Sequence, residues 1–212
     1  MPAPSLISSN APGRPRGLVL MLHGGRADGL GAVEMRAPSW RRSWAMMMQI
    51  SGRLNGAGVD VWLLRYSVRG WNAGVAAEPS PLPDARWALE EVRRERGDVP
   101  VVLLGHSMGG RTAVAVADDP GAVGVVALAP WLPPGEPDAS LAGKRLAVAH
   151  GRRDRITALQ QSRTFCQGAQ RVASSVELVD MGRVGHYMLR SVRAWNLFAV
   201  SRCLDQLGLP GR

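Results

Sequence analysis

The segment Gly105-His106-Ser107-Met108-Gly109 sets a serine between two glycines and is the part of this chain best suited to chemistry. A serine hydroxyl is a poor nucleophile until a base takes its proton. The pattern G-x-S-x-G is typical of a sharp strand-to-helix turn that lifts the hydroxyl clear of the backbone. A glycine-rich turn with a structural serine fits the bare pattern too. The context favours a nucleophile, because an apolar, β-branched run precedes the turn and a small-residue helical segment follows it.

A second motif, His23-Gly24-Gly25, follows an earlier apolar run. Glycines let backbone amides approach a substrate oxygen with no side chain in the way. An amide from Gly24, Gly25 or Arg26, together with the amide of Met108, would form an oxyanion hole, in which each donor contributes about 3 kcal/mol. By itself the motif favours an ordinary turn with left-handed glycines, but beside the serine motif it favours the oxyanion hole.

The base must be one of four histidines. His106 adjoins the serine, and we expect its side chain to point away from the site. We expect His23 to brace the glycine loop, and His150, at the end of an apolar run, to be a buried and hydrogen-bonded residue. His186 lies on a glycine-containing loop between the last predicted strand and the last predicted helix. It is the best-placed base, with a hydrogen-bonded loop histidine as the alternative interpretation.

The acid that orients the imidazole should follow the strand before the histidine's strand. Asp154 does so, and its carboxylate would hold the imidazole tautomer and stabilise the imidazolium. Asp180, at the end of the last predicted strand, is the rival. As an alternative, Asp154 is a surface residue paired with Arg152 or Arg155. The chain order Ser, Asp, His favours Asp154.

The elements that must position these residues alternate between strand and helix. Apolar, β-rich runs predict strands at residues 17–22, 59–66, 99–104, 122–129, 145–149 and 176–179. Helical spacing predicts helices at residues 40–55, 84–96, 110–117, 158–172 and 191–207, with Asp84 as a candidate N-cap. Strands that are apolar on both faces indicate a mostly parallel sheet covered by helices on each side. His23, Ser107, Asp154 and His186 each follow a predicted strand, so we expect them at one edge of that sheet.

The composition predicts one globular domain over residues 17–212, preceded by a flexible segment over residues 1–16. The chain has 212 residues, of which 46% are hydrophobic and 20% charged, which suits a single core. No apolar run approaches the roughly 20 residues of a membrane span. The first residues lack the apolar core of a signal peptide, so a cytoplasmic protein is the default expectation. We expect Cys166 and Cys203 to be buried free thiols, and the sequence predicts neither a cofactor nor a metal-ligand cluster.

A formal charge of +9 raises the possibility of a nucleic-acid partner. The basic residues are scattered, however, and two Tyr and two Phe offer little base stacking. We therefore expect a small-molecule substrate and no nucleic acid, while the oligomeric state stays open. The arginines at positions 26, 65, 69, 111 and 183 fall among the predicted pocket walls. We expect them to be solvated or structural, with small carboxylesters as the default substrate and acidic acyl groups as the weaker hypothesis.

Together these motifs resemble the α/β-hydrolase superfamily over about residues 17–207. The resemblance rests on His23 to Gly25, Gly105 to Gly110, Gly151 to Asp154 and Gly185-His186. It implies an α/β fold with about six to seven strands. Members usually begin with an antiparallel hairpin, but only about 17 residues precede the first clear strand here, so at most one short strand fits. Members usually also carry a cap domain. The Pro-rich segment 130–144 is too short to form one, and we therefore expect a minimal, open site.

For function, the resemblance implies a serine hydrolase that cleaves carboxylic ester or thioester bonds through an acyl-enzyme. Ser107 would be the nucleophile, His186 the base and Asp154 the orienting acid. The expected substrate-binding walls include Tyr66, Trp131, Leu132 and Tyr187. Two alternatives stay open: a non-catalytic binding protein that kept the hydrolase shape, and a peptidase or perhydrolase with the same fold.

Overall fold

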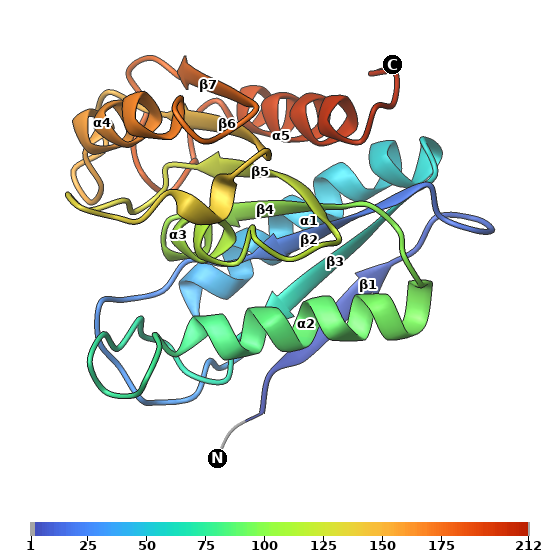
Figure 1. Cartoon of the computed structure of the whole chain (residues 1–212), viewed down its shortest axis with the longest axis horizontal. Helices are drawn as coiled ribbons and strands as arrows, with labels where there is room; N and C mark the ends of the chain where they lie inside the picture. Colours follow the sequence, from blue (N-terminus) through green and yellow to red (C-terminus); the bar gives the residue numbers. More distant parts are fainter. Residues whose placement is uncertain (1–2, 212) are drawn as a thin grey trace.

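A seven-stranded sheet with helices on both faces forms the body of the protein (Figure 1). The computed structural model describes residues 3–211. The strands lie in the order β1-β3-β2-β4-β5-β6-β7. Neighbouring strands are parallel except for β1 and β3, which run antiparallel. The strands are β1 Ser5–Ser9, β2 Gly17–Leu22, β3 Val59–Arg65, β4 Val101–His106, β5 Ala122–Leu128, β6 Arg145–His150 and β7 Ser175–Asp180.

The central strands are apolar because helices cover both of their faces. Every residue of β2 and β4 is buried, and Leu20 of β2 lies in register between Trp62 of β3 and Leu103 of β4. Side chains alternate between the two faces of a strand, so a strand buried on both sides reads as a continuous apolar run. The edge strand β7 has only partly buried and exposed residues, which fits its weaker hydrophobic signal.

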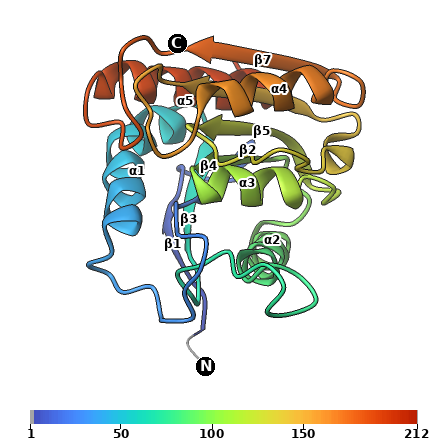
Figure 2. The same cartoon turned by 90° about the vertical axis from the view of Figure 1, so that its left-hand side faces the viewer.

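Five α-helices pack on this sheet, with α1 and α5 on one face and α2, α3 and α4 on the other (Figure 2). They are α1 Pro38–Gly56, α2 Pro81–Arg96, α3 Met108–Ala115, α4 Leu159–Ala169 and α5 Val192–Gln206. In α1 the buried side chains include Met47, Ile50 and Leu54, whereas Met48 is exposed. Of the apolar residues that predict this helix, Met47 and Leu54 belong to the stripe that packs on the sheet, whereas Trp44 and Met48 do not.

Two expectations from the sequence are wrong in detail. Residues 5–9, inside the segment expected to be flexible, form β1 and pair with β3. Asp84 is not the N-cap of α2, because the helix begins at Pro81. Instead, the Asp84 carboxylate accepts hydrogen bonds from the Ser67 amide at 2.7 Å and the Ser67 hydroxyl at 2.8 Å. It thereby ties the start of α2 to the end of β3.

The carboxyl edge of the sheet carries no cap domain. The segment between β5 and β6 contains one short 3₁₀ turn, Ala139–Leu141, so the loops that follow β2, β4, β6 and β7 meet at an open rim. Cys166 and Cys203 are buried and unpaired, as predicted. Within residues 3–211, no helix combines the length and the apolarity needed to cross a membrane.

Candidate active site

Ser107 occupies a strained turn between β4 and α3. Its φ of 56° and ψ of −119° lie outside the regions that L-residues favour. The turn is tight enough to require both flanking glycines. A Cβ at Gly105 would lie 2.2 Å from the carbonyl oxygen of Gly109, and one at Gly109 would lie 2.0 Å from that of Leu22. Strain of this kind persists only where the surrounding structure enforces it, and it concentrates at functional sites.

His186 lies within hydrogen-bond distance of this serine. Its Nε2 is 3.0 Å from Ser107 Oγ, and the two residues are 6% and 7% exposed. Its Nδ1 is 2.7 Å from Asp154 Oδ2. A carboxylate only accepts hydrogen bonds, so Nδ1 carries the proton and Nε2 is left to accept the serine proton. The structure thus brings together three side chains that follow three different strands, in the arrangement needed to activate a hydroxyl.

Two side chains from other elements hold the loop that carries His186. Arg42 of α1 donates to the carbonyl oxygens of Tyr187 at 3.0 Å and Met188 at 3.2 Å. His106 Nε2 donates to the carbonyl oxygen of His186 at 3.0 Å. Neither contact can be predicted from sequence, since both join residues that are far apart along the chain. They hold the backbone from which the imidazole extends.

The carboxylate of Asp154 is saturated with donors. Its Oδ1 accepts from the amides of Ile156 at 2.8 Å and Thr157 at 2.9 Å. Its Oδ2 accepts from His186 and from the Thr157 hydroxyl at 2.9 Å. The two amides belong to the turn that the aspartate begins, so the local backbone already orients the side chain.

A second imidazole, that of His150, also contacts this carboxylate. His150 is fully buried at the end of β6, and its Nε2 lies 3.0 Å from the Thr157 carbonyl oxygen and 3.3 Å from Asp154 Oδ2. Both neighbours are acceptors, so Nε2 carries the proton, and Nδ1 accepts from the Ser162 hydroxyl at 2.8 Å. The expected buried, hydrogen-bonded histidine is found, and its contact with Asp154 is an addition that the sequence did not indicate.

These donors keep Asp154 ionised. Burial alone would raise the pKa of its carboxyl, but the hydrogen bonds from His150, His186 and the Thr157 amide outweigh burial and hold the pKa well below its usual range. An ionised carboxylate beside Nδ1 stabilises the imidazolium that forms when His186 takes a proton. The electrostatics of the site therefore favour proton transfer from Ser107.

Asp180, the rival acid, lies in a different environment. It ends β7 and pairs with Arg152 at 2.7 Å and Arg163 at 3.8 Å on the surface. The hydrogen bond from Arg152 lowers the pKa of its carboxyl. Among residues 3–211, no hydrogen bond joins Asp180 to His186, so this carboxylate cannot orient the imidazole.

The His106 ring does not point away from the site, contrary to the expectation. Its centroid lies 5.0 Å from that of His186. Burial, with help from the nearby His186, lowers the pKa of His106 to about 3. His106 is therefore a neutral donor to the His186 carbonyl and takes no part in proton exchange near neutral pH.

The glycine loop after β2 runs directly beside the serine turn. A Cβ at Gly24 would lie 3.3 Å from Ser107 Cβ, and one at Gly25 would lie 2.4 Å from Met108 Sδ. The first residue of a helix has no intrahelical acceptor for its amide, which leaves the Met108 amide available. Within residues 3–211, no acceptor engages the amides of Gly24 and Gly25. The Arg26 amide differs, because it donates to the Arg69 carbonyl oxygen at 3.0 Å, and this corrects its assignment to the oxyanion hole.

His23 braces this glycine loop. Its Nδ1 donates to the Gly24 carbonyl oxygen at 2.6 Å, and its Nε2 accepts from the Tyr66 amide at 3.3 Å. Burial lowers the pKa of His23 to about 4, so the ring stays neutral and keeps both hydrogen bonds at neutral pH.

The four residues expected to line a substrate site divide into two pairs. Tyr66 and Leu132 are each 1% exposed and lack the surface to touch a substrate, so that expectation is wrong for both. Trp131 is half-buried and stacks on the Arg111 guanidinium, 4.6 Å from the ring centroid. Tyr187 is 58% exposed and lies beside the His186 ring.

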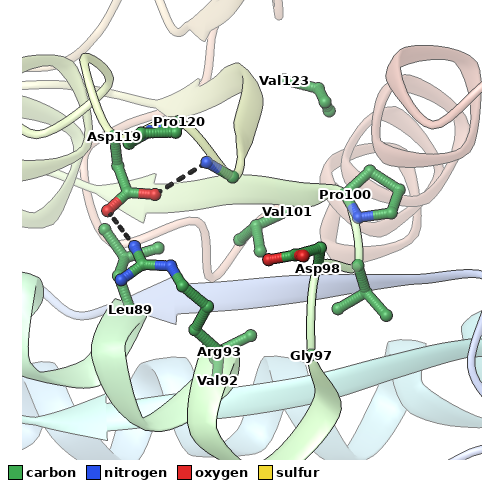
Figure 3. Close-up of a pocket in the computed structure, with 12 residues that line it drawn as sticks. Leu89, Val92, Arg93, Gly97, Asp98, Pro100, Val101, Asp119, Pro120 and Val123 are labelled. Atoms are coloured by element: carbon green, nitrogen blue, oxygen red, sulfur yellow. Dashed lines mark hydrogen bonds and ion pairs between the residues drawn. The ribbon is translucent and has the colours of Figure 1, made fainter.

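Two clefts lie at opposite edges of the sheet. The carboxyl-edge cleft encloses about 410 Å³ and extends from His23 and the glycine loop to the start of α1 and Tyr187. The amino-edge cleft encloses about 550 Å³ between the end of α2 and the residues before β4 and β5 (Figure 3). Across residues 3–211, no group of three or more His, Cys, Asp or Glu side chains has the geometry to hold a metal ion.

The comparison with protein families agrees with this architecture. A family described as the alpha/beta hydrolase family matches residues 19–205. No curated protein matches the sequence.

Solved structures similar to this one are α/β hydrolases and esterases. An α/β serine hydrolase without a lid from Xanthomonas campestris aligns with a TM-score of 0.71 at 17% identity, covering 99% of this chain and 91% of its own. A butyrate-bound esterase from Thermogutta terrifontis aligns with a TM-score of 0.71 at 18% identity and the same coverage. Est1E from Butyrivibrio proteoclasticus, with ferulic acid bound, aligns at 0.70 and 15% identity, covering 97% and 96%. At these identities the likeness shows the fold.

Proposed function

Because this chain belongs to the alpha/beta hydrolase family, we propose that it is a serine hydrolase that cleaves carboxylic ester or thioester bonds. The observation that carries this proposal is the continuous hydrogen-bonded chain from Ser107 Oγ through His186 to Asp154, with distances of 3.0 and 2.7 Å. A serine in a strained turn, an imidazole and an ionised carboxylate in this order are the parts of an acyl-transfer site.

In the first step, Ser107 Oγ attacks the carbonyl carbon of the substrate and His186 Nε2 takes the hydroxyl proton. Asp154 holds the Nδ1 proton and stabilises the imidazolium. The carbonyl oxygen becomes an oxyanion, which we assign to the amides of Met108 and of Gly24 or Gly25. The bond to the leaving group then breaks as His186 returns its proton to the alcohol or thiol, and an ester to Ser107 remains.

In the second step, water replaces the leaving group. His186 takes a proton from water as the water oxygen attacks the acyl carbon, and the same amides hold the second oxyanion. The bond to Ser107 Oγ breaks, His186 returns the proton to the serine, and the carboxylic acid is released. The open carboxyl edge supports this step, because water reaches the acyl-enzyme without the movement of a cap.

The alternatives differ from this proposal in what they leave unexplained. A non-catalytic binding protein gives no reason for the strained Ser107 backbone, which costs stability, or for the hydrogen bonds that join Ser107, His186 and Asp154 in series. A peptidase or a perhydrolase would use the same side chains on another substrate. The esterases among the similar structures favour the ester. We therefore propose a small-molecule ester or thioester as the substrate.

The test is a panel of p-nitrophenyl esters of rising chain length, a thioester and an aminoacyl amide. We expect turnover of at least one ester or thioester, and the Ser107→Ala variant to lose at least about 10³-fold in kcat. Ser174→Ala, at an exposed serine before β7, is the matched control and should keep the wild-type rate. Turnover that survives Ser107→Ala, or no turnover of any ester or thioester, would refute the proposal.

A further inference from the structure

The carboxyl-edge cleft lies beside the turn that carries the nucleophile, and three basic side chains are among the residues that line it. Gly24 and Gly25, which lie against Ser107 and Met108, form one end of it. The other lining residues come from the loop after β2, the start of α1, Arg69 and Tyr187. The cleft of about 410 Å³ is therefore large enough for a small organic group attached to an ester at Ser107.

Charge in this cleft is unbalanced. It is lined by Arg26, Arg36 and Arg69, and by one acidic side chain, Glu34. The Arg69 guanidinium is already engaged, because it donates to the Ala32 carbonyl oxygen at 2.8 Å and pairs with Glu34 at 2.7 Å. Arg69 and Glu34 thus brace the loop and cancel each other, which leaves two positive charges.

Those two charges belong to Arg26 and Arg36. Both side chains are exposed, and neither forms an ion pair with any other residue in the range 3–211. Arg36 stands just before α1, whose first turn contains no acidic residue to offset it. A concave surface with charge of one sign focuses its field and attracts ligands of the opposite sign.

From this arrangement, and resting on the proposed function, we propose that the substrate is an ester with an anionic group on one of its two substituents. A carboxylate is the simplest such group. It binds in the carboxyl-edge cleft against Arg26 and Arg36 while the ester carbonyl lies at Ser107. The expectation that these arginines are solvated or structural holds for Arg69, which braces the loop. For Arg26, the proposal replaces that expectation with a role in binding.

Two matched pairs of esters test the proposal, one for each side of the bond. For the acyl side, 4-nitrophenyl hydrogen glutarate is compared with 4-nitrophenyl pentanoate. For the leaving-group side, the acetate of 4-hydroxybenzoate is compared with the acetate of 4-cresol. Each rate is corrected with the Ser107→Ala rate, because carboxylates assist ester hydrolysis in water. We expect a higher kcat/KM for the anionic ester in at least one pair, with a lower KM.

The double variant Arg26→Gln/Arg36→Gln should reduce that anionic-to-neutral ratio about tenfold, since both guanidiniums are exposed and partly screened by solvent. The ratio in the wild type should also fall as salt is raised. Arg14→Gln removes an equal charge from the loop before β2, at the opposite edge, and should leave the ratio unchanged.

The inference fails if neither pair shows a preference for the anionic ester, or if the double variant keeps the wild-type ratio. In both cases, turnover of the neutral esters that is lost in Ser107→Ala leaves the proposed function standing. If no ester of either pair is hydrolysed, the proposed function and the inference fail together.

Discussion

The amino-edge and carboxyl-edge clefts differ in the side chains that surround them more than in their size. The amino-edge cleft is the larger, at about 550 Å³ against about 410 Å³. There Arg93 pairs with Asp119 at 2.7 Å, and the Asp119 carboxylate also accepts from the Gly121 amide (Figure 3). In the carboxyl-edge cleft, Arg26 and Arg36 have no such partner within residues 3–211.

From this difference we infer that a strained backbone and a buried, hydrogen-bonded carboxylate indicate a candidate active site better than cleft volume does. Within residues 3–211, the amino-edge cleft holds the Arg93–Asp119 ion pair and the exposed Asp98, which forms no ion pair. The carboxyl edge holds Ser107 in a left-handed conformation and a carboxylate with five donors around it. Parallel strands explain the asymmetry, since the loops that follow the strands converge at one rim.

The largest predicted effect is on kcat. It distinguishes a substitution at the carboxyl edge of the sheet from one at the amino edge. His186→Ala removes the base at the carboxyl edge and should reduce kcat for an ester about 10³-fold or more. Arg93→Ala removes the ion pair at the amino edge and should leave kcat and KM within about twofold, because exposed pairs contribute only about 0–1 kcal/mol. Steady-state kinetics on one p-nitrophenyl ester measures both. A large loss of kcat in Arg93→Ala would break the comparison.

The second predicted effect is the difference in kcat between substitutions of two carboxylates, Asp154 and Asp180. Asp154→Asn keeps the shape but cannot hold the correct imidazole tautomer, and kcat should fall on the order of 10³-fold. Asp180→Asn, on the exposed edge strand, should change kcat less than about twofold. Equal effects of the two substitutions in the same assay would show that proximity to His186 is not what matters.

A smaller effect should come from His150, a positioning residue that acts through Asp154. His150→Gln weakens one donor to the carboxylate, and hydrogen bonds to charged groups contribute about 1.5–3 kcal/mol. Because the contact is long, at 3.3 Å, we expect kcat to fall about tenfold with KM unchanged. Ser162→Ala, which removes only the partner of His150 Nδ1, should show a weaker form of the same change. A change in KM alone would contradict this positioning role.

The smallest effect concerns acid stability. The pKa of His23 is lowered to about 4 and that of His106 to about 3 by burial. The unfolded chain therefore binds protons below about pH 6.5 that the folded chain does not, so stability falls as the pH drops from there towards 4. Each histidine should remove up to about 1.4 kcal/mol per pH unit in this range. Urea unfolding at several pH values measures the slope, which should decrease in His23→Gln and stay the same in Arg93→Ala.

Much of this architecture follows from local sequence, and the exceptions have physical reasons. The apolar runs and the glycine turns after them predict six of the strands and place His23, Ser107, Asp154 and His186 at one rim. The sequence leaves room for one short strand before β2 but does not locate it, because Ser5–Ser9 is short, mostly polar and stabilised by pairing with β3. An edge strand of this kind has little signal of its own.

Side-chain environments were harder to predict than strands. The burial of Tyr66 and Leu132 depends on which way the chain turns after its strand, and the engagement of the Arg26 amide depends on the distant Arg69 carbonyl. The contact between His150 and Asp154 joins residues only four positions apart. It forms because the turn from Asp154 to Thr157 directs the carboxylate back towards His150. Non-local packing decides the first two features, an irregular local turn decides the third, and hydrophobic periodicity encodes none of them.

The most direct test of the central claim is covalent labelling of the folded protein with a fluorophosphonate, followed by peptide mass spectrometry. The account predicts one phosphonyl adduct on Ser107, absent in Ser107→Ala, strongly slowed in His186→Ala and unchanged in Ser174→Ala. A folded protein that takes up no label, or that carries it on another residue while Ser107 stays unmodified, would contradict the claim that Ser107, His186 and Asp154 act together as one nucleophilic site.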